Sequence, residues 1–240
     1  MTVHYERLSN LDASFLSLES RSSHMHVGAV AIFGPGPAVD DEGVDIEVIR
    51  ALVNERLDRI PRYRQRLMFV PFEGHPVWVD DDHFQLDYHV RHIALPHPGT
   101  EQQLKSLVGR LMSQQLDRTR PLWEIAVVEG LEDGGFAMVS KTHHCMIDGV
   151  SGIDLMAVLL DFSPQFEVKE AERFVARAAP NSTELAVREV SRAISSTIGS
   201  LGDLSGMIHN LDDAREGLTH RIKATGASLA SGWLTRTDET

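Results

Sequence analysis

Two apolar runs around a glycine-rich segment constrain the fold of this chain more than any other feature. The runs are Leu122–Val128 and Phe136–Ser140, and the residues between them read EGLEDGG. Two short apolar runs flanking a glycine-rich turn are typical of a β-hairpin. The second run leads directly into a pair of histidines. The sequence therefore predicts a fold that contains a sheet and displays these histidines at the end of a strand.

Helical and strand patterns alternate along the rest of the chain. Helices are predicted at 12–18, 45–59, 104–116, 152–161 and 184–201, with Asp12 as a candidate cap for the first and Pro61 ending the second. Further strands are predicted at 26–33, 67–71, 77–79 and 86–93. These patterns predict an α+β or mixed α/β fold.

Composition limits the classes of function. The 240 residues fit one large domain or two small ones, and the net charge of −12 disfavours a nucleic-acid partner. The single cysteine, Cys145, permits no intrachain disulfide, which suits a reducing compartment. No leader pattern opens the chain, and no apolar run approaches the roughly 18 residues of a membrane span. We expect a cytoplasmic protein, with peripheral membrane contact left open.

The segment KTHHCMIDG, residues 141–149, carries the strongest chemical signal. An imidazole with a pKa of about 6.5 can accept a proton at neutral pH. A hydroxyl that attacks a thioester requires such a proton acceptor. Asp148 can hold the loop or an imidazole through charged hydrogen bonds, and Gly149 allows a ligand to approach the backbone. An alternative of similar weight is that the histidines are ordinary strand residues before a turn.

Neighbouring residues on a strand point to opposite faces, so only one of His143 and His144 is expected to face a substrate channel. For the same reason the pair is a poor metal site, and no HExxH or Cys/His ligand spacing is present, so we expect no metal. Cys145 as a nucleophile beside His144 is a weaker alternative, because sequence neighbours on an extended chain face apart.

His143, His144, Asp148 and Gly149 together resemble the HHxxxDG motif of the CoA-dependent acyltransferase superfamily. Within it the chain most resembles the bacterial wax ester synthase / acyl-CoA:diacylglycerol acyltransferase family, through the segments Leu8–Leu16, Pro61–Leu67 and Leu116–Glu124. The resemblance implies a chloramphenicol-acetyltransferase-like half-domain, a mixed sheet flanked by helices, at 1–162. Residues 163–240 would be a crossover with an amphipathic helix, and the C-terminal half would be absent.

The resemblance also implies a mechanism and a set of roles. His144 would be the general base for direct transfer, without an acyl-enzyme, from acyl-CoA to diacylglycerol or a fatty alcohol. No cofactor would be permanently bound. Asp148 would be structural and paired with an arginine, for which Arg64 is the candidate, although a solvated arginine face at 59–66 is the alternative. Pro121 and Trp123 would border the substrate channel, although a buried hairpin tryptophan explains Trp123 equally well.

Two other functions remain compatible with the sequence. A lipid-surface or scaffold protein that keeps the fold without catalysis would use the amphipathic stretch 184–201. A condensation-type enzyme would instead take its acyl group from a carrier-protein thioester. In the acyltransferase interpretation, the expected partners are the C-terminal half of the protein and a membrane or lipid-droplet surface.

Overall fold

The computed structural model describes residues 3–36, 38–40, 43–147, 158, 171, 173–192 and 194–195. It groups the chain into two compact units, residues 1–183 and 184–240. In the second unit residues 184–192 are helical, which agrees with the start of the helix predicted at 184–201. The helix predicted at 152–161 lies outside the described residues, apart from the helical residue Val158.

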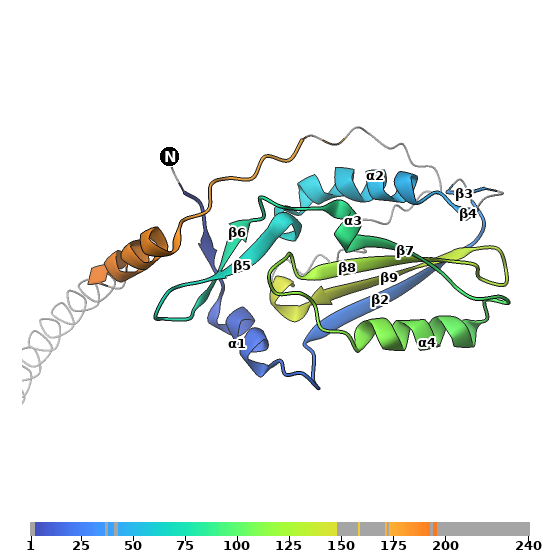
Figure 1. The fold of residues 1–240 in the computed structure, drawn as a ribbon, viewed down its shortest axis with the longest axis horizontal. Coiled ribbons are helices and arrows are strands. Elements are labelled where there is room, and N and C mark those ends of the chain that lie inside the picture. Colours follow the sequence, from blue (N-terminus) through green and yellow to red (C-terminus); the bar gives the residue numbers. More distant parts are fainter. Residues whose placement is uncertain are drawn as a thin grey trace, which may run out of the picture. The chain divides into compact units, whose positions relative to one another are not determined.

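A four-stranded sheet forms the centre of the first unit (Figure 1). Its strand order is β2–β9–β8–β7, with β2 at His26–Phe33, β9 at Phe136–His143, β8 at Trp123–Glu129 and β7 at Val90–Ala94. β9 runs antiparallel to both neighbours, whereas β7 and β8 are parallel. The sheet is therefore mixed, and the predicted hairpin forms its centre.

Side-chain alternation along β8 divides the interior into two cores. Ile125 and Val127 point into the larger core, and Ala126 and Val128 point into the smaller one. The smaller core is closed by α4 (Glu101–Met112), which packs across one face of the sheet (Figure 1). This helix begins with a capping box in which Thr100 and Gln103 bond reciprocally.

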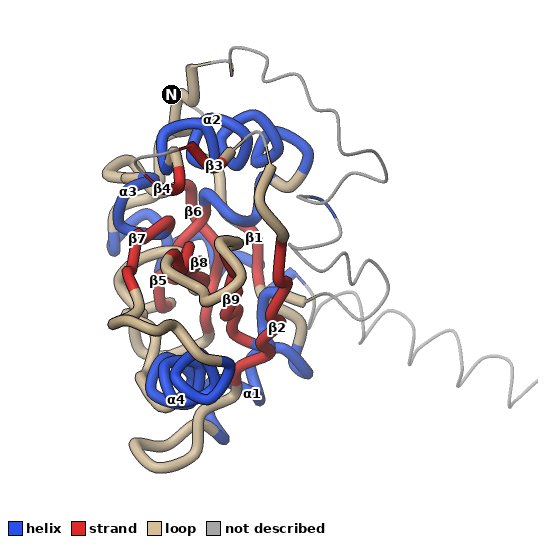
Figure 2. Tube along the Cα trace, turned by 90° about the vertical axis from the view of Figure 1, so that its right-hand side faces the viewer, coloured by secondary structure: helices blue, strands red, loops and turns tan. Residues whose placement is uncertain are grey.

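The larger core lies between the opposite face of the sheet and a second layer (Figures 1 and 2). That layer contains α2 (Ile46–Arg56) and a small antiparallel sheet of β1 (Glu6–Arg7), β6 (Pro76–Asp80) and β5 (Gln65–Phe69). The helix α1 (Asn10–Leu18) packs against the same core through Leu16. The shorter elements are β3 (Val39–Asp40), β4 (Gly43–Val44), α3 (Leu86–His89) and 3-10 turns at Leu57–Arg59, Pro61–Arg64 and His144–Met146.

Several predicted element ends were wrong. The first helix is capped by Ser9, whose hydroxyl accepts the Asp12 N–H, so Asp12 lies inside the helix. α4 ends at Met112, and Leu116 is buried beyond it. Pro61 opens a 3-10 turn instead of ending α2, which closes at Arg56.

The strand predicted at 86–93 begins with a helical turn, because a tertiary contact fixes that part of the chain. His89 is fully buried, donates from Nδ1 to the Trp123 carbonyl at 2.8 Å and stacks on the Trp123 ring. Only β7 after it, from Val90, joins the sheet.

Part of the segment predicted as a crossover lies along the first unit. Arg177 donates to the buried Asp80 carboxylate from Nε and Nη2, both at 2.8 Å, and His4 donates from its backbone to Ala178 at 3.0 Å. These hydrogen bonds hold the pKa of Asp80 well below its usual range, although burial of the carboxyl opposes the shift. The first compact unit accordingly extends to residue 183.

The edge strand β2 carries an exposed apolar strip. Within the described part of the chain it pairs only with β9. Val30 and Ile32 lie on one face of the strand and are 45% and 58% exposed, and Val27 on the other face is 39% exposed. A strand edge with outward apolar side chains is a natural surface for another segment of protein.

Candidate active site

The His-His pair lies where β9 leaves the sheet. His143 is the last residue of β9, and His144 opens the 3-10 turn that follows. Both neighbouring segments hold this junction, since the His143 N–H donates to Leu122 at 2.9 Å and the His144 N–H donates to Met25 at 2.8 Å. The histidines lie at the end of a strand, as expected, but the strand includes only the first of the two.

His143 is buried, and protein groups face both of its ring nitrogens. Its Nδ1 accepts the Cys145 N–H at 3.1 Å, which places the ring proton on Nε2. That Nε2 lies 3.7 Å from Oε2 of Glu19. Burial lowers the pKa of His143 to about 4, against the opposing effect of Glu19, so the ring is neutral at pH 7.

His144 occupies a different environment. It is only partly buried, and its ring stacks on Phe15 of α1 with centroids 4.0 Å apart. Its Nδ1 is buried and has no hydrogen-bond partner among the described residues. The prediction that both histidines lie on a strand was wrong for His144, because a 3-10 turn rather than strand alternation orients this ring.

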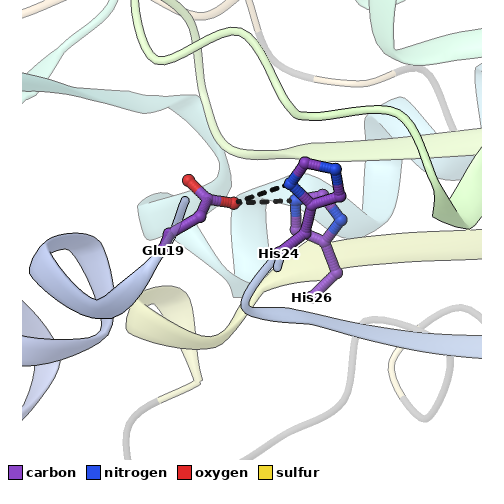
Figure 3. A group of neighbouring side chains, drawn as sticks. All are labelled: Glu19, His24 and His26. Carbon is purple, nitrogen blue, oxygen red and sulfur yellow. Dashed lines mark ion pairs between the residues drawn. The ribbon is translucent and has the colours of Figure 1, made fainter. Parts of the chain in front are cut away.

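A buried carboxylate behind the junction was not predicted. Glu19 follows α1 directly, and its Oε2 accepts from Arg118 at 2.7 Å and from Gln115 at 3.0 Å. Although burial opposes the shift, these hydrogen bonds and the charge of Arg118 hold the pKa of Glu19 below its usual value. The Oε1 atom of the same carboxylate faces His24 and His26 (Figure 3).

The only signal for this group in the sequence is a His-x-His spacing just before a predicted strand, at 24–26. The pairing of β2 with β9 places His26 directly opposite His143. Sequence spacing does not reveal which strands pair, so the link between His26 and the His-His pair could not be found from it.

Trp123 lies in the core. It is fully buried, donates from Nε1 to the Tyr63 carbonyl at 2.7 Å and stacks on His89 with centroids 4.6 Å apart. Pro121 is also buried and accepts the Trp123 N–H at 2.9 Å. This packing supports the structural interpretation of Trp123, and contact of either residue with substrate stays a prediction.

Arg64 is 4% exposed, so it is not part of a solvated arginine face. Its guanidinium bonds to the Asp58 carboxylate and to both oxygens of Asn54, at 3.0 and 3.1 Å. It also lies over the Phe174 ring at 5.1 Å. Asp148 and Gly149 lie outside the described residues, so their pairing and position stay predictions.

Cys145 has the properties of a structural thiol. Its side chain is buried, and burial strongly raises the pKa of the thiol. A nucleophilic cysteine requires a thiolate at neutral pH. The structure therefore argues against the alternative in which Cys145 attacks the substrate.

This fold is shared with solved structures of condensation domains. The first condensation domain of the calcium-dependent antibiotic synthetase superimposes with a TM-score of 0.51 at 22% identity, over 65% of this chain and 36% of that one. At this identity the likeness shows the fold alone. The expected fold class, a mixed sheet flanked by helices of the condensation and chloramphenicol acetyltransferase type, is confirmed.

The family follows from the sequence comparisons. The model of the wax ester synthase/diacylglycerol acyltransferase catalytic domain matches residues 8–234. The chain belongs to this family, and the prediction of an acyltransferase is confirmed.

Individual relatives agree with this assignment. The probable diacylglycerol O-acyltransferase tgs3 of Mycobacterium tuberculosis H37Rv is 36% identical over 213 residues, covering 84% of this chain and 77% of the relative. Its tgs1 counterpart is 38% identical over 232 residues, covering 82% and 49%. The wax ester synthase/diacylglycerol acyltransferase of Marinobacter aquaeolei VT8 is 38% identical with a TM-score of 0.51, covering 61% and 36%. The match thus spans about half or less of the latter two proteins.

Among the described residues, no helix combines the length and apolar character needed to cross a bilayer.

Proposed function

We propose that this protein transfers a long-chain acyl group from acyl-CoA to the hydroxyl of diacylglycerol or a long-chain alcohol, with His144 as general base. The observation that carries the proposal is the different surroundings of the two histidines. Both ring nitrogens of His143 face protein groups and the residue is fully buried. His144 is partly exposed, so of the two rings it is the one that a substrate can reach.

The reaction needs no acyl-enzyme. His144 accepts the proton of the acceptor hydroxyl while the oxygen attacks the thioester carbonyl, which gives a tetrahedral intermediate. Collapse of this intermediate forms the ester and breaks the carbon–sulfur bond. The His144 imidazolium returns its proton to the departing CoA thiolate, so the products are the ester and CoA. Acyl-CoA acts as a co-substrate in this scheme, and no bound cofactor takes part.

His143 would act as a positioning residue. Because its ring is held between the Cys145 N–H and the Glu19 carboxylate, it fixes the backbone from which His144 projects. Asp148 would hold the following turn, with Arg64 as its candidate partner, and Gly149 would leave room for the thioester. Pro121 and Trp123 would shape the substrate channel from the core side.

The remaining part of the protein and a lipid surface are the proposed partners. The chain spans 49% of the tgs1 relative and 36% of the Marinobacter enzyme, so we propose that a C-terminal half completes the channel. The exposed strip on β2 supports such a partner. On the second unit, Val187, Val190 and Ile194 are exposed at helical spacing, which supports peripheral contact with a membrane or lipid droplet.

Transfer of labelled long-chain acyl-CoA to diacylglycerol tests the proposal. The chain is assayed alone and together with a C-terminal half from a family member. His144→Ala is expected to lower turnover by about 10²–10⁴-fold. The control is His83→Ala, since the His83 side chain is 87% exposed and contacts Asp82. Normal turnover of His144→Ala would refute the base assignment.

The same assay separates the other two functions. A scaffold protein would bind liposomes without acyl transfer in either assay, and a condensation-type enzyme would use acyl-carrier protein but not acyl-CoA. Membership of the family favours neither, and the likeness to condensation domains concerns the fold alone.

A further inference from the structure

We propose that Glu19, His24 and His26 form a binding site for one divalent transition-metal ion, with Zn²⁺ as the probe. The Oε1 atom of Glu19 lies 3.3 Å from Nε2 of His26 and 3.8 Å from Nδ1 of His24 (Figure 3). The three atoms lie within 4.8 Å of one another. Tetrahedral zinc with bonds of about 2.0–2.2 Å places its ligand atoms roughly 3.4 Å apart, so a small adjustment closes the site.

The three atoms are buried and unsatisfied. The side chains of Glu19, His26 and His24 are 1%, 2% and 13% exposed. Glu19 Oε1, His24 Nδ1 and His26 Nε2 have no hydrogen-bond partner among the described residues. Buried polar atoms are rarely left without partners in native proteins, so their convergence on one point calls for a ligand.

The tautomer of His24 identifies the charge of that ligand. Its Nε2 lies 3.0 Å from the Ser113 carbonyl, which can only accept, so in the neutral ring Nε2 carries the proton and Nδ1 presents a lone pair. This lone pair faces a carboxylate oxygen, which also only accepts. A cation between the two resolves the conflict, and a second nitrogen bonded to a carbonyl is typical of a metal-ligating histidine.

The surroundings orient the carboxylate and select the kind of ion. Arg118 and Gln115 bond to Oε2 of Glu19 and leave Oε1 directed at the histidines. One carboxylate beside the cations Arg118 and Lys141 gives little attraction for Ca²⁺ or Mg²⁺. Two imidazoles favour Zn²⁺ and other divalent ions of the late first-row transition metals.

A bound ion would tie the end of α1 to the start of β2, beside the candidate active site. Glu19 ends α1, which carries Phe15 against His144, and His26 opens β2 opposite His143. The rings of His26 and His143 are 6.1 Å apart, and the Glu19 carboxylate also faces His143. A metal bound here would overturn the expectation from sequence that no metal is bound.

Calorimetric titration of chelator-stripped protein with Zn²⁺ tests the proposal. We expect one ion per chain, with a dissociation constant below about 10 µM, as is typical of three-ligand sites. We expect no binding of Ca²⁺. His24→Ala and His26→Ala should each weaken binding by at least about tenfold. The control is His83→Ala, because His83 belongs to the other group of potential ligands, Asp81, Asp82 and His83. That variant should keep the affinity of the wild type.

A spectroscopic measurement guards against variants that misfold. Co²⁺ in place of Zn²⁺ should give the intense visible absorption of a four-coordinate site in the wild type. The more conservative His24→Asn variant, whose fold is checked by circular dichroism, should lose that absorption. Equal binding by wild type and the His24/His26 variants, or loss of binding in His83→Ala, would overturn the assignment. So would a wild-type dissociation constant above about 100 µM.

Discussion

The Nε2 atom of His143 lies 3.7 Å from Oε2 of Glu19, and both side chains are 1% exposed. The pair joins the end of α1 to the end of β9, and Arg118 bonds to the same carboxylate oxygen at 2.7 Å. A buried carboxylate is tolerated only when it is paired and hydrogen-bonded. Glu19 therefore lies paired behind the first histidine, whereas the second histidine stays partly exposed.

Glu19→Gln should lower the free energy of unfolding by about 2 kcal/mol. The amide keeps the shape but loses the charge that Arg118 and His143 face. The Arg118 side chain is 33% exposed, so water limits the loss. The measurement is urea unfolding at pH 7 in the presence of a chelator. Glu47→Gln is the matched control, because Glu47 pairs with Arg50 while 74% exposed, and should change stability by less than about 0.5 kcal/mol.

Stability should depend on the buried His89 as the pH falls. Burial lowers the pKa of His89 to about 4, from 6.5. Below pH 6.5 the unfolded chain takes up a proton that the folded chain does not, so the free energy of unfolding decreases until the pH reaches about 4. The contribution of this residue should approach about 1.4 kcal/mol per pH unit within that window.

His89→Asn tests this dependence. The asparagine amide can still donate to the Trp123 carbonyl but does not titrate. The variant should be less stable at pH 7 and should show a flatter decline between pH 6.5 and 4, so that the two curves converge. Parallel curves from urea unfolding across this range would contradict the assignment of a neutral buried ring.

Trp123→Phe should cost about 2–4 kcal/mol. The substitution leaves a cavity and removes the Nε1 donor from the Tyr63 carbonyl, at a residue that is fully buried. The measurement is chemical denaturation followed by circular dichroism. A loss below about 1 kcal/mol would show that the indole is not central to the core.

Charges placed on the β2 strip should weaken assembly without unfolding the chain. Val30→Lys with Ile32→Lys changes side chains that are 45% and 58% exposed, so we expect less than about 1 kcal/mol of lost stability. Association with a C-terminal half from a family member, measured by sedimentation, should fall at least tenfold. Phe72→Lys, at a fully exposed turn residue, should leave association unchanged. Equal association of all three proteins would contradict a role for the strip.

Local patterns in the sequence determined most of the sheet. The strand predicted at 26–33 is β2, and the two runs around the glycine-rich turn are β8 and β9, because period-two alternation and turn composition are local properties. The motif also identified His143 and His144 as the candidate site. Element ends were less predictable. Ser9 rather than Asp12 caps α1, since the choice of cap depends on where the backbone leaves the helix.

The tertiary structure alone decided how the two histidines differ. The pairing of β2 with β9 brings His26 opposite His143, and the end of α1 brings Glu19 behind it. Arg118 then reaches the same carboxylate from the segment before β8. Spacing along the chain carries no information about these contacts, because strand pairing and helix packing join residues far apart in sequence. The sequence by itself determined that a histidine pair stands at the end of a strand, and only packing decided which ring is buried and which stays partly exposed.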